Sequence, residues 1–222
     1  MTMTSSDSVP FAAMRHAMVA SQLRTNAVDD ARVVAAMAAV PREAFLPADA
    51  RAVAYRDTAI PLGRARYANL PMATGRLLTA AELTSADRVL LIGAAGGYTA
   101  ALLAELVAHV AAVESDPALA ALARQALAGD PRVTLVEGPL DAGHRDGAPY
   151  DVLVVDGAIE TVPDALVAQV RPGGRAVSGI VDRGVTRLAA GRRTDGGFAL
   201  VAFADVECVV LPGFAVPKPF TF

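Results

Sequence analysis

The chain has 222 residues, of which 54% are hydrophobic and 19% are charged, a composition typical of a folded domain rather than a disordered segment. Its 20 basic and 23 acidic residues give a formal net charge of −3, so we expect no attraction to nucleic acid. The single cysteine, Cys208, excludes a disulfide framework and a cysteine-based zinc site. Without an apolar run of about 20 residues or a signal-like start, the sequence predicts a cytoplasmic protein with no membrane partner.

The first part of the chain shows helical spacing and then a less regular region. Apolar residues recur at helical spacing from Phe11 to Leu23, which predicts a first helix. A second helix is expected to begin near Asp29 and Asp30, whose carboxylates suit a helix N-terminus, and to stop before Pro41. Beyond it we expect no regular alternation of strands and helices. Residues 1–78 are therefore predicted to form a mainly helical N-terminal section with loops.

The pattern changes near Thr79, because short apolar runs then alternate with helical stretches. We expect strands at 89–92, 109–114, 133–136, 152–155 and 175–180, and helices at 98–107, 117–127 and 163–170. Such alternation predicts an α/β fold, a doubly wound and mostly parallel sheet with helices on both faces. Two more strands, at 198–203 and 206–211, are expected to add an antiparallel edge. Residues 79–222 would form this sheet domain, in one compact unit with residues 1–78.

A glycine-rich turn follows the first predicted strand and is the strongest candidate for a ligand site. Gly93-Ala94-Ala95-Gly96-Gly97 lets a ligand approach the backbone and leaves helix N–H groups free to receive it. Glu114 ends the next strand, 21 residues after Gly93, where a dinucleotide-binding fingerprint places its ribose-binding acid. We favour a nucleotide-like ligand here. The alternative is a tight strand-to-helix turn followed by a solvated glutamate.

Several segments of the sequence also resemble the motifs of a known family. The segments "VLLIGAAGGYTAALLA", "VAAVESDPALAALAR" and "APYDVLVVDGAIETVPDALVAQVRPGGRAV" are similar to successive motifs of the protein-L-isoaspartate O-methyltransferase family. Upstream, "MVASQLR", "VPREAFLP" and "AYRDTAIPLG" are similar to the family's N-terminal signatures. This resemblance implies a methyltransferase sheet of Rossmann-like form, S-adenosylmethionine as cofactor, and methyl transfer to isoaspartyl carboxylates in damaged proteins. The candidate cofactor residues are Gly93, Ala95, Gly97, Glu114 and Gly138, with Asn69 in the substrate loop, and Asp156 is added because it ends a buried strand.

The chain departs from the family pattern at several of these positions. Leu91 stands where relatives usually have an acid before the loop, and Ala95 replaces the middle glycine. The family's Gly-Asp-Gly segment becomes Gly138-Pro139-Leu140, so Pro139 offers neither a carboxylate nor an N–H group to adenine. Asn69 replaces a hydroxyl residue, although its amide still donates a hydrogen bond to a carboxylate. These changes predict weakened cofactor binding and weak methyl transfer.

Two further features leave their roles open. Asp156 follows a buried strand and either orients ligand or caps a loop or helix. The aromatic, proline-rich tail from Pro212 to Phe222 has three possible places: across the active-site mouth, on a second subunit, or on its own domain. The three histidines lack metal-ligand spacing, so no metal site is expected. The alternative to an enzyme is a catalytically weak or inactive relative that binds partners through the altered pocket.

Overall fold

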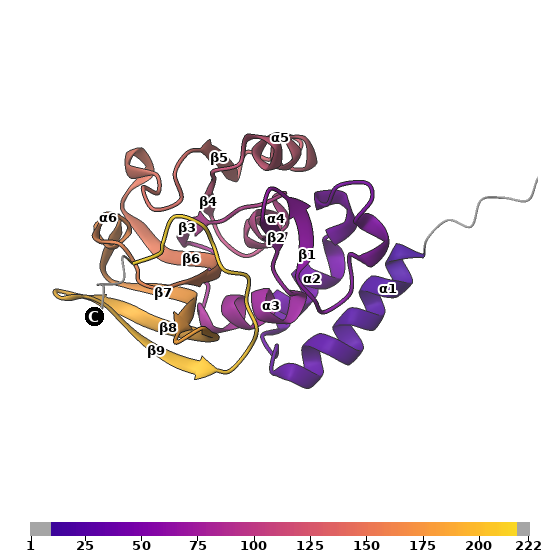
Figure 1. Ribbon diagram of the computed structural model, residues 1–222, viewed down its shortest axis with the longest axis horizontal. Helices are drawn as coiled ribbons and strands as arrows, with labels where there is room; N and C mark the ends of the chain where they lie inside the picture. The colour runs from indigo at the N-terminus through magenta and orange to yellow at the C-terminus, as the bar shows by residue number, and fades with distance from the viewer. Residues whose placement is uncertain (1–9, 217–222) are drawn as a thin grey trace, which may run out of the picture.

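The computed structural model describes residues 10–216 and contains a seven-stranded sheet in the order β5-β4-β3-β6-β7-β8-β9 (Figure 1). Neighbouring strands from β5 to β7 pair in parallel, whereas β8 and β9 pair antiparallel. The strands are β3 (Arg88–Ile92), β4 (His109–Glu114), β5 (Val133–Glu137), β6 (Tyr150–Ile159), β7 (Val170–Asp182), β8 (Val185–Thr194) and β9 (Gly197–Ala204). The predicted doubly wound, mostly parallel sheet with an antiparallel edge is confirmed.

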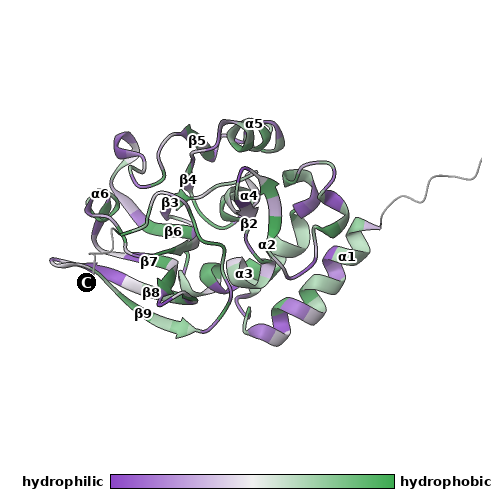
Figure 2. Cartoon of the chain, in the orientation of Figure 1, coloured by the Kyte–Doolittle hydropathy of each residue, from purple (hydrophilic) through white to green (hydrophobic). Residues whose placement is uncertain are grey.

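Alternate residues of the central strands face two different apolar clusters. Val89 and Leu91 of β3 belong to the larger cluster, whereas Leu90 and Ile92 belong to the smaller one. The strand is thus buried on both faces, as its unbroken run of apolar residues predicts. Hydrophobic residues accordingly concentrate on the central strands in Figure 2. The crossover helices are α4 (Tyr98–Ala104), α5 (Pro117–Ala126) and α6 (Asp164–Val167), the last shorter than expected.

The N-terminal section begins with the two predicted helices. The helix α1 (Phe11–Met18) continues as a π-helix to Leu23, and α2 (Ala31–Ala39) follows. The Asp30 carboxylate caps α2 by accepting hydrogen bonds from the backbone N–H groups of Arg32 and Val33, at 2.8 and 3.2 Å. Two side chains of this section, Met18 and Met37, belong to the larger apolar cluster, with Val89 and Leu91 of β3. Within residues 10–216, no helix is long and apolar enough to cross a membrane.

The region after Pro47 is more regular than the sequence predicts. A separate two-stranded hairpin, β1 (Ile60–Gly63) and β2 (Arg66–Ala68), leads into the ten-residue helix α3 (Pro71–Ala80). The expectation of irregular structure here was wrong for α3. Six of its residues are buried, including Thr74 and Gly75, so its apolar residues form no single stripe that periodicity detects. Gly75 lets the helix approach closely, because a Cβ there would lie 3.0 Å from a methyl group of Val28.

The antiparallel edge also differs from the prediction at its C-terminal end. The expected strand at 206–211 is absent, and the missed strand β8 pairs with both β7 and β9. Residues 206–211, called the crossing segment below, instead run beside the carboxyl end of β6 in a single parallel bridge, where Ala158 donates to the Val209 carbonyl at 2.6 Å and Leu211 donates to the Ala158 carbonyl at 2.9 Å. Apolar side chains of this segment are buried by the crossing, which explains its strand-like composition. Residues 1–9 and the end of the predicted tail, 217–222, lie outside the described residues.

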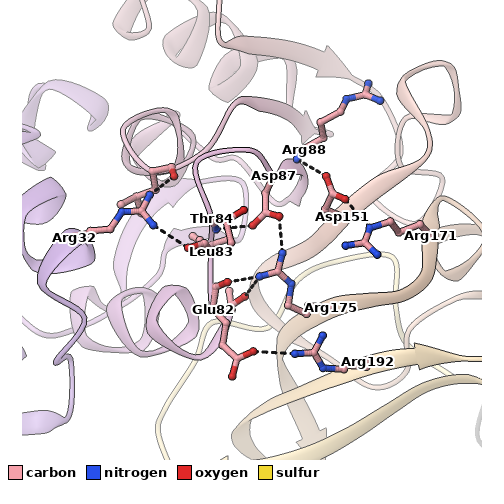
Figure 3. A network of polar contacts seen from close by, with 12 residues as sticks. Arg32, Glu82, Leu83, Thr84, Asp87, Arg88, Asp151, Arg171, Arg175 and Arg192 are labelled. Atoms are coloured by element: carbon pink, nitrogen blue, oxygen red, sulfur yellow. Dashed lines mark hydrogen bonds and ion pairs between the residues drawn. The ribbon is translucent and has the colours of Figure 1, made fainter.

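The amino end of the sheet is held by a network of ion pairs and backbone contacts (Figure 3). Asp87, just before β3, pairs with Arg175 of β7 at 2.6 Å, and both side chains are largely buried. Asp151 accepts from the backbone N–H group of Arg88 at 2.8 Å. Glu82 pairs with Arg192 of β8 at 2.9 Å, but both of these side chains are mostly exposed. The network therefore joins the turn before β3 to β6, β7 and β8, away from the glycine-rich turn.

The burial of these pairs predicts unequal contributions to stability. Asp87→Asn should lower the free energy of unfolding by about 2 kcal/mol, because it leaves the charge of Arg175 buried without a countercharge. Glu82→Gln is the matched control and should cost less than about 0.5 kcal/mol, since exposed pairs contribute little. Urea unfolding of both variants measures the difference. Equal losses would contradict the view that Asp87 anchors this end of the sheet.

Candidate functional site

The glycine-rich turn lies where the sequence predicts it, between β3 and α4. Gly93 and Gly97 have φ values of +83° and +98°, and Ala95 has +48°, so three of the five residues are left-handed. Such a conformation suits glycine and costs roughly 1–2 kcal/mol for alanine. Gly96 is required for a different reason, because a Cβ at this position would lie only 2.0 Å from the Phe45 carbonyl oxygen. The turn is therefore packed tightly against the N-terminal section.

Glu114 lies at the carboxyl end of β4 beside this turn, as predicted, and its side chain is fully buried. Its Oε2 accepts from the Ala95 backbone N–H group at 2.7 Å, and its Oε1 accepts from those of Ser115 and Asp116 at 2.9 and 2.8 Å. Both oxygens also accept from the Arg66 guanidinium, with Nη2 lying 2.9 Å from Oε2 and Nη1 close to Oε1. The carboxylate is therefore not solvated, and five N–H contacts fill its acceptor positions.

Asn69 and Asp156 are brought together on the other side of the turn. The Asn69 Nδ2 group donates to Oδ1 of Asp156 at 2.9 Å, and the Thr74 hydroxyl donates to the same oxygen at 2.9 Å. The Thr99 hydroxyl, from the first turn of α4, donates to Oδ2 of Asp156. The Asn69 Oδ1 atom accepts from the backbone N–H group of Val209 at 3.2 Å. Asp156 thus joins α3, α4 and β6, and Asn69 links it to the crossing segment 206–211.

A buried arginine supports the loop that carries Asn69. The Arg42 side chain donates from Nη2 to the Asn69 carbonyl at 2.6 Å and from Nε to the Ala54 carbonyl at 2.9 Å. Its guanidinium lies 4.8 Å from the centre of the Tyr98 ring. Burial lowers the pKa of Arg42, while nearby Tyr98 and Asp156 oppose that shift. Burial raises the pKa of Tyr98, whose hydroxyl is buried and lacks a hydrogen-bond partner within residues 10–216.

The crossing segment 206–211 closes the site from the sheet's carboxyl end. Leu211 lies against both Gly93 and Gly157, because a Cβ on either glycine would approach its side chain to within 3 Å. Cys208 is buried beside Asn69, and burial raises the pKa of its thiol to about 12. Phe214 is also buried, so the first part of the tail packs on its own domain. These contacts place apolar side chains where the strand ends would otherwise be open.

The predicted site residues divide into three groups. Asn69, Gly93, Ala95 and Asp156 line one small cavity of about 20 Å³, together with Arg42 and Tyr98. Glu114 contacts the turn from the side, through Ala95, and Gly97 begins α4. Gly138 lies apart from the cavity, donating its backbone N–H group to the Glu114 carbonyl at 3.0 Å, and nothing lies within 4 Å of a Cβ placed there.

Sequence reasoning missed the partners of these residues. Arg66 gives little signal, because a lone arginine in a turn-rich region is ordinarily solvated. Thr74 was missed because α3 was not predicted. Thr99 follows the glycine turn by two residues, so its place in the first turn of a helix after a predicted strand was a usable signal. Arg42 lies directly after Pro41, and nothing in its local sequence marks it as buried.

The chain is also similar in sequence to known proteins. Residues 14–212 match the family model described as protein-L-isoaspartate(D-aspartate) O-methyltransferase (PCMT). The chain is 39% identical over 213 residues to a protein-L-isoaspartate O-methyltransferase 1 of Rhodopseudomonas palustris, covering 94% of this chain and 87% of the relative. It is 37% identical over 201 residues to a protein-L-isoaspartate O-methyltransferase of Methanoculleus marisnigri, covering 90% and 91% of the two chains.

Solved structures show the same fold. One named as a protein-L-isoaspartate O-methyltransferase superposes with a TM-score of 0.76 at 22% identity, covering 90% of this chain and 66% of the other. A protein from Plasmodium falciparum described as a "putative protein-L-isoaspartate O-methyltransferase", in complex with S-adenosyl-L-homocysteine, gives a TM-score of 0.72 at 16% identity, covering 90% of this chain and 97% of the other. The sheet and its helices therefore form the methyltransferase fold that the sequence predicts.

The close approach at Gly96 gives a direct test of how tightly the turn is packed. Gly96→Ala should lower the free energy of unfolding by about 3 kcal/mol, because a backbone oxygen cannot move aside as a flexible side chain does. Gly196→Ala, in the β8–β9 turn, is the matched control, since nothing lies within 4 Å of its added Cβ. Guanidinium unfolding measures both changes, and a loss below about 1 kcal/mol for Gly96→Ala would contradict this packing.

Proposed function

This chain belongs to the protein-L-isoaspartate(D-aspartate) O-methyltransferase family, and we propose that it methylates the side-chain carboxylate of isoaspartyl residues in damaged proteins. S-adenosylmethionine is the methyl donor in this proposal. The observation that carries it is the family match, which extends over the glycine turn, Glu114 and the loop of Asn69. Because relatives with the enzyme's name align over 94% of the chain, a purely partner-binding role is not favoured.

The residue types around the turn suit an adenosine-containing cofactor, although Arg66 holds the carboxylate that a ribose would contact. A turn with left-handed residues before α4 and a carboxylate at the end of the next strand match the chemistry of a nucleoside site. The Tyr98 hydroxyl, which has no hydrogen-bond partner among the described residues, adds a buried polar group beside the turn. In the described conformation the Arg66 guanidinium donates hydrogen bonds to both oxygens of Glu114.

When bound, S-adenosylmethionine supplies a methyl group already activated by its sulfonium, so the protein mainly has to position the acceptor carboxylate. Asn69 and Thr99 line the cavity, and together with Thr74 they donate hydrogen bonds to Asp156. Arg42 holds the Asn69 backbone from beneath and partly balances the charge of Asp156. We propose that these groups orient the acceptor.

The substrates in this proposal are isoaspartyl-containing proteins or peptides, with neither nucleic acid nor membrane as partner. We further propose a cytoplasmic location. The single cysteine supports it, because Cys208 is a free, buried thiol of the kind that reducing compartments maintain. The pairing of Glu114 and the substitution Pro139 support the expectation that cofactor binding is weaker than in relatives with the full motifs.

Methylation of a matched pair of peptides tests the proposed function. The wild-type protein should transfer labelled methyl groups from S-adenosylmethionine to an isoaspartyl peptide, but not to the same peptide with ordinary aspartate. Asn69→Ala should lower kcat/KM about tenfold, because it removes the donor to Asp156 and the acceptor for Val209. Asn26→Ala is the matched control, since Asn26 is exposed and distant in sequence from the cavity residues.

Two outcomes would contradict the proposal. Absence of methylation of the isoaspartyl peptide at millimolar cofactor would count against the enzyme itself. Equal methylation of the two peptides would instead show a carboxyl methyltransferase without isoaspartyl selectivity. If Asn69→Ala and Asn26→Ala had the same activity, the role assigned to Asn69 would be wrong while the methylation itself stood.

A further inference from the structure

The contact between Arg66 and Glu114 is the feature of the site that the proposed function does not explain. The Arg66 side chain is 5% exposed and that of Glu114 is 0% exposed, so both charges are removed from water. The guanidinium approaches the carboxylate in bidentate fashion, Nη1 to Oε1 and Nη2 to Oε2. Such parallel hydrogen bonds between charged groups are among the strongest in proteins. This pair therefore fixes β2 against the end of β4.

The two oxygens that Arg66 contacts are the acceptors that a ribose would need. Adjacent ribose hydroxyls present two O–H donors side by side, and a carboxylate at this strand end accepts them in nucleoside-binding folds. The guanidinium also presents two donors side by side. The backbone N–H groups of Ala95, Ser115 and Asp116 fill the remaining acceptor positions. The hydroxyls of a ribose and the guanidinium of Arg66 therefore cannot both donate hydrogen bonds to the Glu114 carboxylate.

We propose that Arg66 sets the cofactor affinity of this protein by competing with the cofactor ribose for Glu114. This inference rests on the proposed function, because it takes S-adenosylmethionine as the ligand. In the described conformation Arg66 occupies the ribose position, and the cofactor binds when β2 carries the arginine away. Arg66 is thus a positioning residue that acts through Glu114, not a catalytic residue.

The structure of the hairpin is consistent with such a movement. β1 and β2 form a sheet of their own, with no strand pairing to the seven-stranded sheet. The turn between them holds Arg64 and Ala65 at φ values of +48° and +58°, a conformation that costs non-glycine residues free energy. Tyr67, next to Arg66, is 44% exposed, and the Arg64 side chain is 73% exposed. The tip of the hairpin therefore has little packing to lose when Arg66 leaves Glu114, whereas Ile60 and Ala68 at its base are buried in the larger apolar cluster.

The competition should change the apparent dissociation constant of the cofactor by a measurable factor. If the conformation with Arg66 released is populated at about 10% without ligand, the apparent dissociation constant is about tenfold larger than the intrinsic one. Removing the guanidinium removes this penalty. Glu114 keeps the three backbone donors after that change, so its buried carboxylate is not left without partners.

Calorimetric titration with S-adenosylhomocysteine tests the inference without requiring turnover. Arg66→Ala should bind this product about tenfold more tightly than the wild type. Arg64→Ala is the matched control, because it also removes an arginine from this hairpin. The Arg64 side chain lies near Asp116 instead, with its Nη1 atom 3.9 Å from Oδ2. This control variant should change the affinity less than twofold. Arg66→Gln is neutral but keeps an amide donor, and should also bind more tightly, which covers the case in which the alanine variant does not fold.

The outcomes separate this inference from the proposed function. If the wild type binds S-adenosylhomocysteine and folded Arg66→Ala or Arg66→Gln binds no more tightly, the competition is refuted and the proposed function stands. Binding by the Arg66 variants but not by the wild type would support both. If no form binds at millimolar concentration, the cofactor assignment fails and the inference fails with it.

Discussion

The carboxylate of Glu114 accepts hydrogen bonds from three parts of the chain, and the geometry of the candidate site depends on it. The backbone N–H group of Ala95, in the glycine turn, donates to it, as do those of Ser115 and Asp116 at the start of the following crossover. The Arg66 guanidinium donates to it from the β1–β2 hairpin. A buried carboxylate needs such partners, because burying an unpaired charge costs several kcal/mol. In the described conformation the protein itself supplies all of them.

A second carboxylate repeats this arrangement with neutral donors. Asp156 is bound by Asn69, Thr74 and Thr99, which come from three different segments. In both places a negative charge at the carboxyl end of a parallel strand is satisfied internally, at the edge of the sheet where α/β proteins bind their ligands. Ligand binding must therefore exchange existing hydrogen bonds for new ones, so only the difference between the two sets contributes to affinity.

Much of the fold could be predicted because each strand of the parallel sheet is a short apolar run and each crossover has helical spacing. The glycine turn and Glu114 were placed correctly for the same reason, since both lie at predicted strand ends. Helix α3 was not predicted, because it is buried around most of its surface and includes Thr74 and Gly75. The segment 206–211 has strand-like composition, yet its apolar side chains cover the carboxyl end of the sheet and the segment adds no further strand. The Arg66 contact spans 48 positions and follows from tertiary structure alone.

The account depends most on the claim that one carboxylate serves either Arg66 or a ribose. A crystal structure of the chain grown with S-adenosylhomocysteine tests this claim directly. We expect the Glu114 carboxylate to accept hydrogen bonds from the two ribose hydroxyls, with the Arg66 guanidinium withdrawn and the hairpin displaced. A bound product beside an intact bidentate Arg66–Glu114 pair would contradict the account.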